Sequence, residues 1–403
     1  MTDSDSSAYL VSGFRTPVGK YGGTLSSVRP DDLMALTIKK TVEEAGLDPS
    51  AVDEVIIGNA NGAGEENRNV ARMSWLLAGY PDTVPGITVN RLCASGMSAI
   101  ALATAMVESG QADIVLAGGV ESMSRAPWVL EKPTKGFARP GEIFDTSIGW
   151  RFVNKQFAGM DKMTYSMPET AEEVANVFNI SREDADAFAA RSHARALAAI
   201  EAGKFDAEIV PVEVKDRKGN VTVVDTDEGP RPGSTPEVLS KLRPVTSLGE
   251  VTTAGNSSTL NDGASAVIVA SQRGIDKLGL KPRARVVANA ARGLQPEIMG
   301  MGPVLATREI LSRSGWDLAE VDAVELNEAF ATQSLACMRE LGLDEEKTNA
   351  WGGAIALGHP LGSSGSRITL TLLNRLETEG GTRGIATMCI GVGQGTAIAI
   401  ERV

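Results

Sequence analysis

Apolar residues recur along this chain with two different periods, and the alternation of these periods predicts a layered α/β fold. Short apolar runs bounded by polar residues or glycine predict buried strands at 8–15, 55–58, 113–119 and 262–270. Helical periodicity and capping residues predict helices at 31–45, 69–79 and 181–203. Strands that alternate with helices are typical of a sheet with helices on its faces.

One predicted turn joins a strand to a helix and contains a cysteine. An alternating run that includes Ile87 and Val89 ends there, and a helix of small residues begins just after Cys93 and ends near Gly110. The first N–H groups of this helix lie beside the sulfur, so we expect them to lower the pKa of the Cys93 thiol. A small cysteine packed in a buried turn would give the same local pattern.

Two further glycine-dense turns contain residues capable of acid–base chemistry. His359 lies within 352–362, and Cys389 lies within 388–395. Glycines allow the backbone to approach a ligand closely, which makes His359 a candidate functional residue. The other histidine, His193, lies among arginines on a predicted helix, and we interpret it as a surface residue.

The chain contains an internal repeat. Residues 46–55 resemble residues 315–324, and the same offset aligns Cys93 with Gly362 and Ser95–Gly96 with Ser364–Gly365. The two halves also finish alike, because 262–269 resembles 394–400. We therefore predict two similar α/β halves, each of which presents the start of a buried helix to a shared site.

Between the halves the composition changes to a segment rich in aromatic residues and proline. A strand of the first half follows this segment, so we interpret it as an insertion, a common location for substrate selectivity. The predicted organisation is an N-terminal half at 1–123 plus 251–274, an inserted loop domain at 124–250 and a C-terminal half at 275–403.

Composition narrows the class of protein. The 403 residues carry a formal net charge of −12, which argues against nucleic acid as the main partner. No apolar run is long enough to cross a membrane, and the acidic N-terminus, Met1–Asp5, does not resemble a secretory signal. Three widely separated cysteines favour a reducing compartment, so we expect a cytoplasmic enzyme. Neither metal-ligand spacing nor a nucleotide-binding fingerprint is present, and no metal is expected.

Two cysteines and one histidine in tight glycine turns suit acyl transfer through a thioester. One thiolate would attack an acyl carbonyl, the histidine would take its proton, and the second cysteine would move the proton at the α-carbon or leaving group. Backbone N–H groups in the glycine turns would stabilise the oxyanion. The third cysteine, Cys337, is interpreted as a core residue.

Five motifs distributed over nearly the whole chain resemble those of the thiolase (acetyl-CoA C-acyltransferase) family. They are Asn90–Gly96, Gly118–Ser124, Asn327–Ala331, Gly358–Pro360 and Cys389–Gly395. The resemblance implies a five-layer αβαβα fold with two similar halves and an inserted loop domain, usually assembled as a homotetramer. It also implies acyl-CoA and coenzyme A as substrates, with no covalently bound cofactor.

The resemblance also implies roles for single residues. Cys93 would be the acylated nucleophile, His359 its activator and Cys389 the acid and base of the carbon–carbon step. Asn327 would hold a water that forms one oxyanion hole with His359, and the N–H groups of Cys93 and Gly391 would form the other. Coenzyme A contacts carry over to Arg231, Ala254, Gly255 and Ser258, and acyl-pocket contacts to Met167 and Phe330; ordinary packing would also account for the last two.

One departure bears on the substrate. Acetoacetyl-CoA thiolases of biosynthesis have a substrate-contacting histidine just before the loop-domain helix, where this chain has Ser166. Several stretches instead resemble 3-oxoadipyl-CoA thiolases of aromatic-compound degradation: Tyr21–Arg29, Glu66–Met73 and Ile148–Asn154. A dicarboxylic substrate needs a cation near its free carboxylate, and our hypothesis is that Arg151 or Lys155 provides it.

Other functions remain open at this stage. An acetyl-CoA acetyltransferase or a fatty-acid 3-ketoacyl-CoA thiolase would use the same catalytic residues on another acyl chain. A decarboxylating ketoacyl synthase shares the fold, but its usual His and Asn pattern is not seen. A non-catalytic CoA- or lipid-binding relative would tolerate loss of the cysteines, and a papain-like hydrolase would give Cys389 no role.

Overall fold

The computed structural model describes residues 7–403, so the acidic N-terminal stretch interpreted above lies outside the described residues. Within that range ten strands form one large sheet, in the order β12-β13-β14-β11-β1-β10-β5-β3-β4, with β2 beside β10. Their bounds are β1 Ala8–Arg15, β2 Gly19–Lys20, β3 Glu54–Gly58, β4 Gly86–Val89, β5 Ile114–Ser122, β10 Asn261–Ser271, β11 Ala284–Gly293, β12 Ala323–Leu326, β13 Arg383–Ile390 and β14 Gln394–Arg402.

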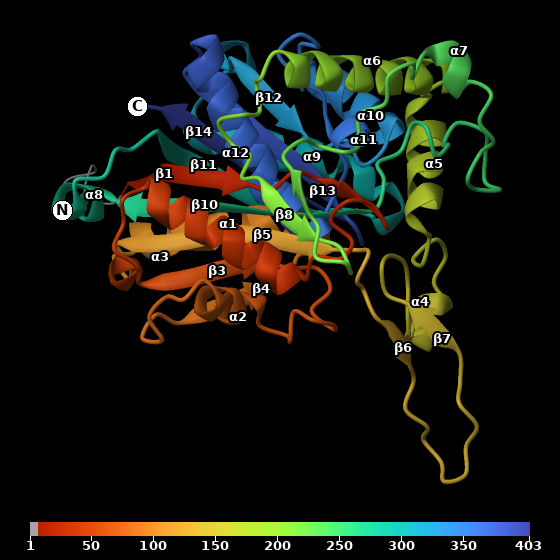
Figure 1. The fold of residues 1–403 in the computed structure, drawn as a ribbon. Coiled ribbons are helices and arrows are strands. Elements are labelled where there is room, and N and C mark those ends of the chain that lie inside the picture. The colour runs from red at the N-terminus through yellow and green to blue at the C-terminus, as the bar shows by residue number, and fades with distance from the viewer. Residues whose placement is uncertain (1–6) are drawn as a thin grey trace.

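The helices cover this sheet in layers (Figure 1). Helices α1 and α2 pack on the outer face of the N-terminal half, α3 and α12 lie between the two halves, and α9 packs on the outer face of the C-terminal half. The bounds are α1 Pro30–Glu44, α2 Val70–Leu77, α3 Ser95–Glu108, α4 Lys155–Ala158, α5 Met167–Phe178, α6 Arg182–Glu201, α7 Pro236–Leu239, α8 Gln272–Leu278, α9 Gly302–Ser314, α10 Ala331–Leu341, α11 Ala354–Leu357 and α12 Leu361–Glu379.

The two halves repeat the same strand pairing. In the first, β3 is parallel to β5 and β5 is antiparallel to β10; in the second, β12 is parallel to β13 and β13 is antiparallel to β14. The halves join where β1 pairs with β11. The predicted five-layer fold with two similar halves is confirmed.

The central helices α3 and α12 touch backbone to backbone at matching positions of the repeat. A Cβ atom at Gly96 would lie 2.7 Å from the Gly362 carbonyl oxygen, and one at Gly365 would lie 2.4 Å from the Met97 nitrogen. Around this contact the buried side chains of both helices and both half-sheets form one apolar cluster. Only glycine permits the close approach, which explains why the repeat retains it in both halves.

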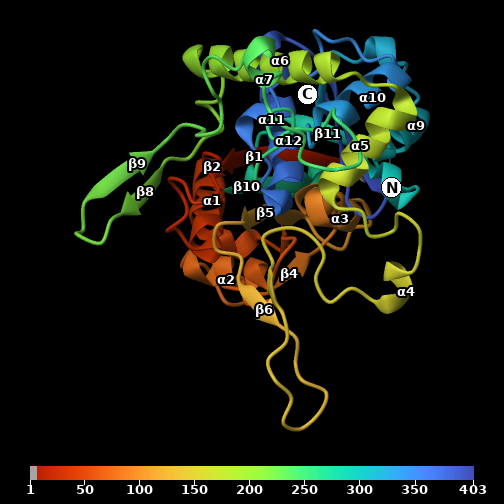
Figure 2. The same ribbon diagram turned by 90° about the vertical axis from the view of Figure 1, so that its right-hand side faces the viewer.

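The segment between β5 and β10 leaves the sheet and returns to it. It carries two arms, β6 Trp128–Leu130 with β7 Ile143–Asp145, and β8 Val212–Lys215 with β9 Val221–Val224. The first arm extends away from the layers in Figure 1, and Figure 2 shows the second arm projecting from another side. The exact domain boundaries stay a prediction.

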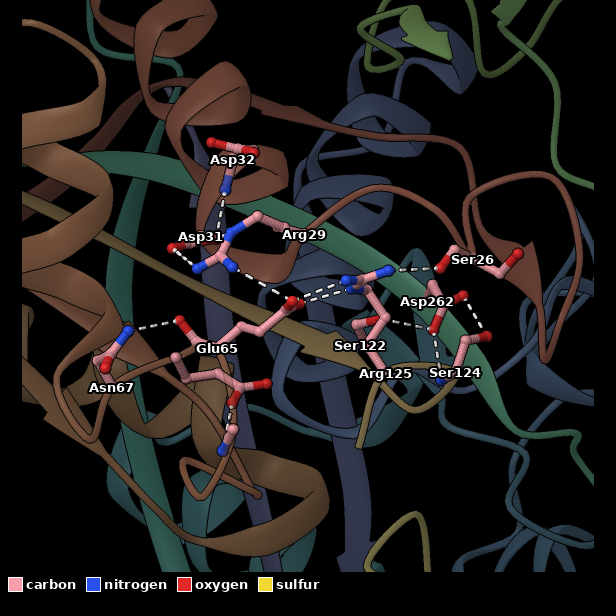
Figure 3. A network of polar contacts seen from close by, with 12 residues as sticks. Ser26, Arg29, Asp31, Asp32, Glu65, Asn67, Ser122, Ser124, Arg125 and Asp262 are labelled. Carbon is pink, nitrogen blue, oxygen red and sulfur yellow. Dashed lines mark hydrogen bonds and ion pairs between the residues drawn. The ribbon is translucent and has the colours of Figure 1, made fainter. Parts of the chain in front are cut away.

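A polar network fastens the start of this segment to the core (Figure 3). The Glu65 carboxylate lies between two guanidinium groups and accepts hydrogen bonds from Arg29 at 3.2 Å and from Arg125 at 2.5 and 2.7 Å. Hydrogen bonding by Arg125 lowers the pKa of Glu65. Nearby, Asp262 of β10 accepts from the Ser124 hydroxyl at 2.6 Å. These contacts hold the loop between β3 and α2 next to the inserted segment.

Candidate active site

The turn between β4 and α3 presents the Cys93 side chain. Cys93 lies in a single helical turn that directly precedes α3, and it is half-buried. Leu92, just before it, has a φ of +47°, and Val392 across the site has a φ of +63°. Positive φ is strained for both side chains, and such strain gathers at functional sites. The N–H groups of Gly391 and of Cys93 itself interact with the sulfur.

The expected lowering of the Cys93 pKa is wrong. Burial raises the pKa of the Cys93 thiol to about 11, and the two N–H groups only partly oppose that effect. The helix start was visible in the sequence, but the segments that cover it come from distant parts of the chain. Desolvation disfavours the thiolate more strongly than the N–H groups favour it. The resting Cys93 side chain is therefore a neutral thiol.

His359 lies in the turn before α12 and is 4% exposed. Its Nδ1 is 2.6 Å from the Ser364 hydroxyl, which donates to the Pro360 carbonyl at 3.0 Å. Because that hydroxyl proton is already used, Nδ1 carries the ring proton and donates it to Ser364. The other ring nitrogen, Nε2, is left as an acceptor and lies 3.4 Å from the Asn327 side-chain nitrogen.

Burial, aided by Arg367, lowers the pKa of His359 to about 3. The imidazole is consequently neutral at physiological pH and able to accept a proton. In the predicted pairing of this thiol with this imidazole, both groups are neutral, so the proton would move as the sulfur attacks, not before.

Cys389 and Asn327 come from the ends of neighbouring strands. Parallel strands β12 and β13 end at the same edge of the sheet, and the Asn327 N–H donates to the Thr387 carbonyl at 3.0 Å. Burial, with Cys93 and Cys337 nearby, raises the pKa of Cys389 well above its ordinary value. Among the described atoms, the buried Asn327 Oδ1 has no hydrogen-bond partner. It is therefore free to accept a hydrogen bond from a ligand or water.

A cavity of about 210 Å³ opens beside Cys93. Cys93, Met167 and Gly391 line it together, and much of the remaining wall comes from residues 146–151 and 165–166 of the inserted segment. Ser166, at the position of the missing histidine, lines the cavity and caps α5. Most of the cavity wall is apolar, as expected for a site that excludes water around an acyl group.

The remaining acyl-pocket residue lies in an adjoining apolar cluster. Phe330 is 8% exposed and belongs to the cluster that contains Cys389 and packs against Met167. The structure therefore brings both residues of the predicted acyl pocket, Met167 and Phe330, next to the second cysteine.

The predicted coenzyme A contacts lie outside this cavity, in two loops. The loop with Ala254 and Gly255 continues into Ser258, whose N–H donates to the Ala329 carbonyl at 2.9 Å. Arg231 is exposed, and its loop approaches α11 so closely that a Cβ at Gly229 would lie 2.2 Å from the Ala356 carbonyl oxygen. Both loops thus adjoin segments that carry predicted catalytic residues.

His193 is not a surface residue, so that prediction is wrong. It is 5% exposed because its face of α6 packs under the Arg231 loop, and its Nδ1 accepts the Arg231 backbone N–H at 3.2 Å. Burial, with Arg231 and Lys20 nearby, lowers the pKa of His193 to about 4. Cys337, in contrast, is fully buried as predicted.

Sequence reasoning missed two residues of the site. Ser364 was noticed only as part of the repeat, and Glu121 only as part of a glycine-rich motif. A carboxylate in the middle of an otherwise apolar and glycine-rich strand was the available signal for Glu121, since a buried charge is costly unless something binds it.

Two family models together match nearly the whole chain. The N-terminal domain of thiolase matches residues 8–273, and the C-terminal domain of thiolase matches residues 280–402. The chain belongs to the thiolase family. As a thiolase it is an acyltransferase that binds acyl-CoA and uses coenzyme A as co-substrate.

Two curated relatives align with nearly the full length of this chain. Beta-ketoadipyl-CoA thiolase of Pseudomonas aeruginosa is 55% identical over 401 residues, 98% of this chain and 99% of the relative. The 3-oxoadipyl-CoA/3-oxo-5,6-dehydrosuberyl-CoA thiolase of Escherichia coli K12 is 52% identical, again over 98% and 99%.

Solved structures confirm the fold of the thiolase. Acetyl-CoA acetyltransferase of Bacillus anthracis superposes with a TM-score of 0.93 at 39% identity, covering 100% of both chains. Human mitochondrial 3-ketoacyl-CoA thiolase in complex with CoA gives 0.91 at 40% identity, covering 98% of both. In the described part of the chain, no helix is both long and apolar enough to span a bilayer.

Proposed function

We propose that this thiolase cleaves 3-oxoadipyl-CoA with coenzyme A, giving succinyl-CoA and acetyl-CoA. The observation that carries this substrate is charge in the cavity: among its described lining residues, only Arg151 has a positively charged side chain. A guanidinium group recognises a carboxylate through charge-assisted hydrogen bonds. The names of the Pseudomonas aeruginosa and Escherichia coli relatives support the same substrate.

Of the two cations predicted to bind the free carboxylate, Arg151 is the better supported. It is partly buried and lines the cavity that contains Cys93. Lys155 begins α4, is exposed and is absent from the lining of that cavity. An exposed cation binds a carboxylate weakly because water and salt screen it.

In the first half-reaction Cys93 attacks the 3-oxo carbonyl while its proton moves to Nε2 of His359. The C2–C3 bond then breaks, and its electron pair forms the enolate of acetyl-CoA. Cys389 gives its proton to the α-carbon, acetyl-CoA leaves, and a succinyl thioester remains on Cys93. The high pKa of the buried Cys389 keeps this thiol protonated until the step needs it.

In the second half-reaction the Cys389 thiolate takes the proton of the coenzyme A thiol. The coenzyme A sulfur attacks the succinyl carbonyl, the bond to Cys93 breaks, and protonated His359 returns its proton to Cys93. Succinyl-CoA leaves, and all three residues are back in their starting protonation states. The neutral forms favoured by burial suit this cycle.

Two oxyanion sites are supported by available hydrogen-bonding groups. The N–H groups of Cys93 and Gly391 converge near the sulfur, where the oxygen of a Cys93 thioester would develop charge. Nε2 of His359, once it carries the proton of Cys93, and a water on Asn327 would form the other site. Arg231, Ala254, Gly255 and Ser258 would hold coenzyme A, and Met167 and Phe330 would line the acyl chain.

We further infer a homotetramer in the cytoplasm. On the β6–β7 arm, Trp128 is 73% exposed and Ile143 is 62% exposed in the single chain, and exposed apolar clusters mark protein contacts. The three cysteines are free, which fits a reducing compartment. Light scattering should give four times the chain mass of 42.3 kDa; a monomer would contradict the assembly.

The deciding experiment compares kcat/KM for CoA-dependent cleavage of 3-oxoadipyl-CoA and acetoacetyl-CoA. We expect a preference of about 100-fold for the dicarboxylic substrate, equivalent to about 2.7 kcal/mol in transition-state binding. Arg151→Ala should remove most of that preference, and Lys155→Ala serves as the matched control. Equal rates with both substrates would favour a general acetyl-CoA acetyltransferase.

A further inference from the structure

A buried carboxylate that has no cationic side-chain partner among residues 7–403 lines the same cavity. Glu121 lies near the end of β5 and is 3% exposed. Three backbone N–H groups donate to it: those of Ala60 and Gly362 to Oε2, each at 2.9 Å, and that of Asn61 to Oε1 at 3.2 Å. Burial raises the pKa of Glu121 to about 7. A group this costly to bury needs a purpose beyond packing.

The two N–H groups on Oε2 connect to the turns that carry His359 and Cys93. Gly362 lies in the first turn of α12, the helix whose Ser364 binds His359. The Ala60 carbonyl accepts a hydrogen bond from the Asn90 side-chain NH₂ at 2.8 Å. The Asn90 side-chain oxygen in turn accepts one from the Leu92 N–H. One carboxylate oxygen thus supports both the base and the nucleophile.

The N–H group on Oε1 leads instead to the acyl end of the cavity. Asn61 accepts a hydrogen bond from Arg151 Nη2 at 3.3 Å and donates to the Thr146 hydroxyl at 2.9 Å. Arg151 and Thr146 both belong to the inserted segment. The path from Glu121 through Asn61 to Arg151 therefore crosses from the central sheet to the insertion.

We propose that Glu121 is a positioning residue that sets the place of Arg151 through Asn61, and so selects acyl groups that end in a carboxylate. This inference rests on the proposed function. The negative charge of Glu121 also repels a substrate carboxylate from the catalytic end of the cavity, which leaves Arg151 as the favourable place for it.

Glu121→Gln separates the two duties of the carboxylate. The amide oxygen can still accept the N–H groups of Ala60 and Gly362, whereas the amide NH₂ cannot accept the Asn61 N–H. We expect kcat/KM for 3-oxoadipyl-CoA to fall about tenfold and that for acetoacetyl-CoA to change by less than about threefold. Glu66→Gln is the control: Glu66 is a buried carboxylate of the neighbouring loop between β3 and α2, its charge raises the pKa of Glu121, and it does not line the cavity, so its loss removes a nearby charge but no acceptor of the Asn61 N–H.

A double-mutant cycle with Arg151→Ala tests whether Glu121 acts through Arg151. If Glu121 acts through Arg151, Glu121→Gln will not reduce the preference further once Arg151 is gone. Equal losses on both substrates, or additive losses of preference in the double variant, would overturn the inference. A wild-type enzyme without preference would refute the proposed substrate and the inference together, whereas a preference that Glu121→Gln leaves unchanged would refute the inference alone.

Discussion

The starts of the two central helices occupy the same place in the repeat but carry different chemistry. At the start of α3, Cys93 faces a cavity. At the matching position of α12, Gly362 is packed so tightly that a Cβ atom would lie 2.4 Å from the Val120 carbonyl oxygen and 2.9 Å from Asn59 Cα. The duplicated scaffold therefore has room for a side chain at only one of its two equivalent helix starts.

Because of this difference, the two helix starts carry different reactive side chains. The turn before α3 carries Cys93, the predicted nucleophile. The turn before α12 carries His359, the predicted base, oriented by Ser364, two residues beyond Gly362. The matching serine, Ser95, is used differently: it donates to the Leu92 carbonyl at 2.7 Å and accepts the Arg91 N–H at 2.9 Å. A repeat thus keeps its backbone while each copy acquires its own reactive group.

Removing the nucleophile should have the largest effect. Cys93→Ala should lower kcat by at least about 10⁴-fold, because no acyl-enzyme can form. Mass spectrometry after incubation with 3-oxoadipyl-CoA should detect an acyl adduct only on the wild type. Cys337→Ala, which removes a buried thiol away from the cavity, is the control. An adduct that persists in Cys93→Ala would reassign the nucleophile.

The second prediction concerns the protonation state of the Cys93 thiol. In a His359→Asn variant, which lacks the base, the rate of Cys93 alkylation by iodoacetamide should rise about tenfold per pH unit between pH 7 and pH 10. The reason is that burial raises the pKa of Cys93 to about 11, so the thiolate fraction grows with pH over this whole range. A rate already constant above pH 7.5 would mean that the helix start dominates after all.

Adding a side chain at Gly362 tests whether the start of α12 is closed to side chains. Gly362→Ala should lower kcat by roughly 100-fold and destabilise the fold by about 1–3 kcal/mol, because the added methyl displaces β5 or the turn before α12. Urea unfolding and steady-state kinetics measure the two effects. Gly141→Ala, where an added Cβ meets nothing within 4 Å, should change neither.

The matched serines should respond differently. Ser364→Ala should lower kcat by about tenfold with little change in stability, since His359 loses the partner that fixes its tautomer. Ser95→Ala should instead cost about 1 kcal/mol of stability through its lost capping bonds. Equal effects of the two substitutions on kcat would show that Ser364 serves only to cap α12.

The smallest expected effect is a pH dependence of substrate choice. Because the pKa of Glu121 is raised to about 7, protonation of its carboxyl as the pH falls from 8 to 6 removes an acceptor from the Asn61 N–H. Glu66, Cys93 and Arg151 are the other titratable or charged groups around it. The preference for 3-oxoadipyl-CoA should fall a few-fold over that range, and Glu121→Gln should flatten the profile.

Much of the molecule could be predicted from local patterns. The turn at Cys93, the strand β5, the helix α6 and the duplicated halves all follow from residues close together in sequence, because periodicity and capping act over a few residues. The reactive residue types and their glycine turns were equally visible. The catalytic roles of Cys93, His359 and Cys389 are predictions that the geometry supports and kinetics must test.

Tertiary structure decided what depends on distant segments. It reversed the expected pKa of Cys93 and buried His193 beneath the Arg231 loop, because desolvation is set by whatever covers a group and not by its sequence neighbours. It also distinguished Arg151 from Lys155 and brought Glu121 into contact with Ala60, Asn61 and Gly362. Residue types follow from the sequence, whereas protonation states and partners require the folded chain.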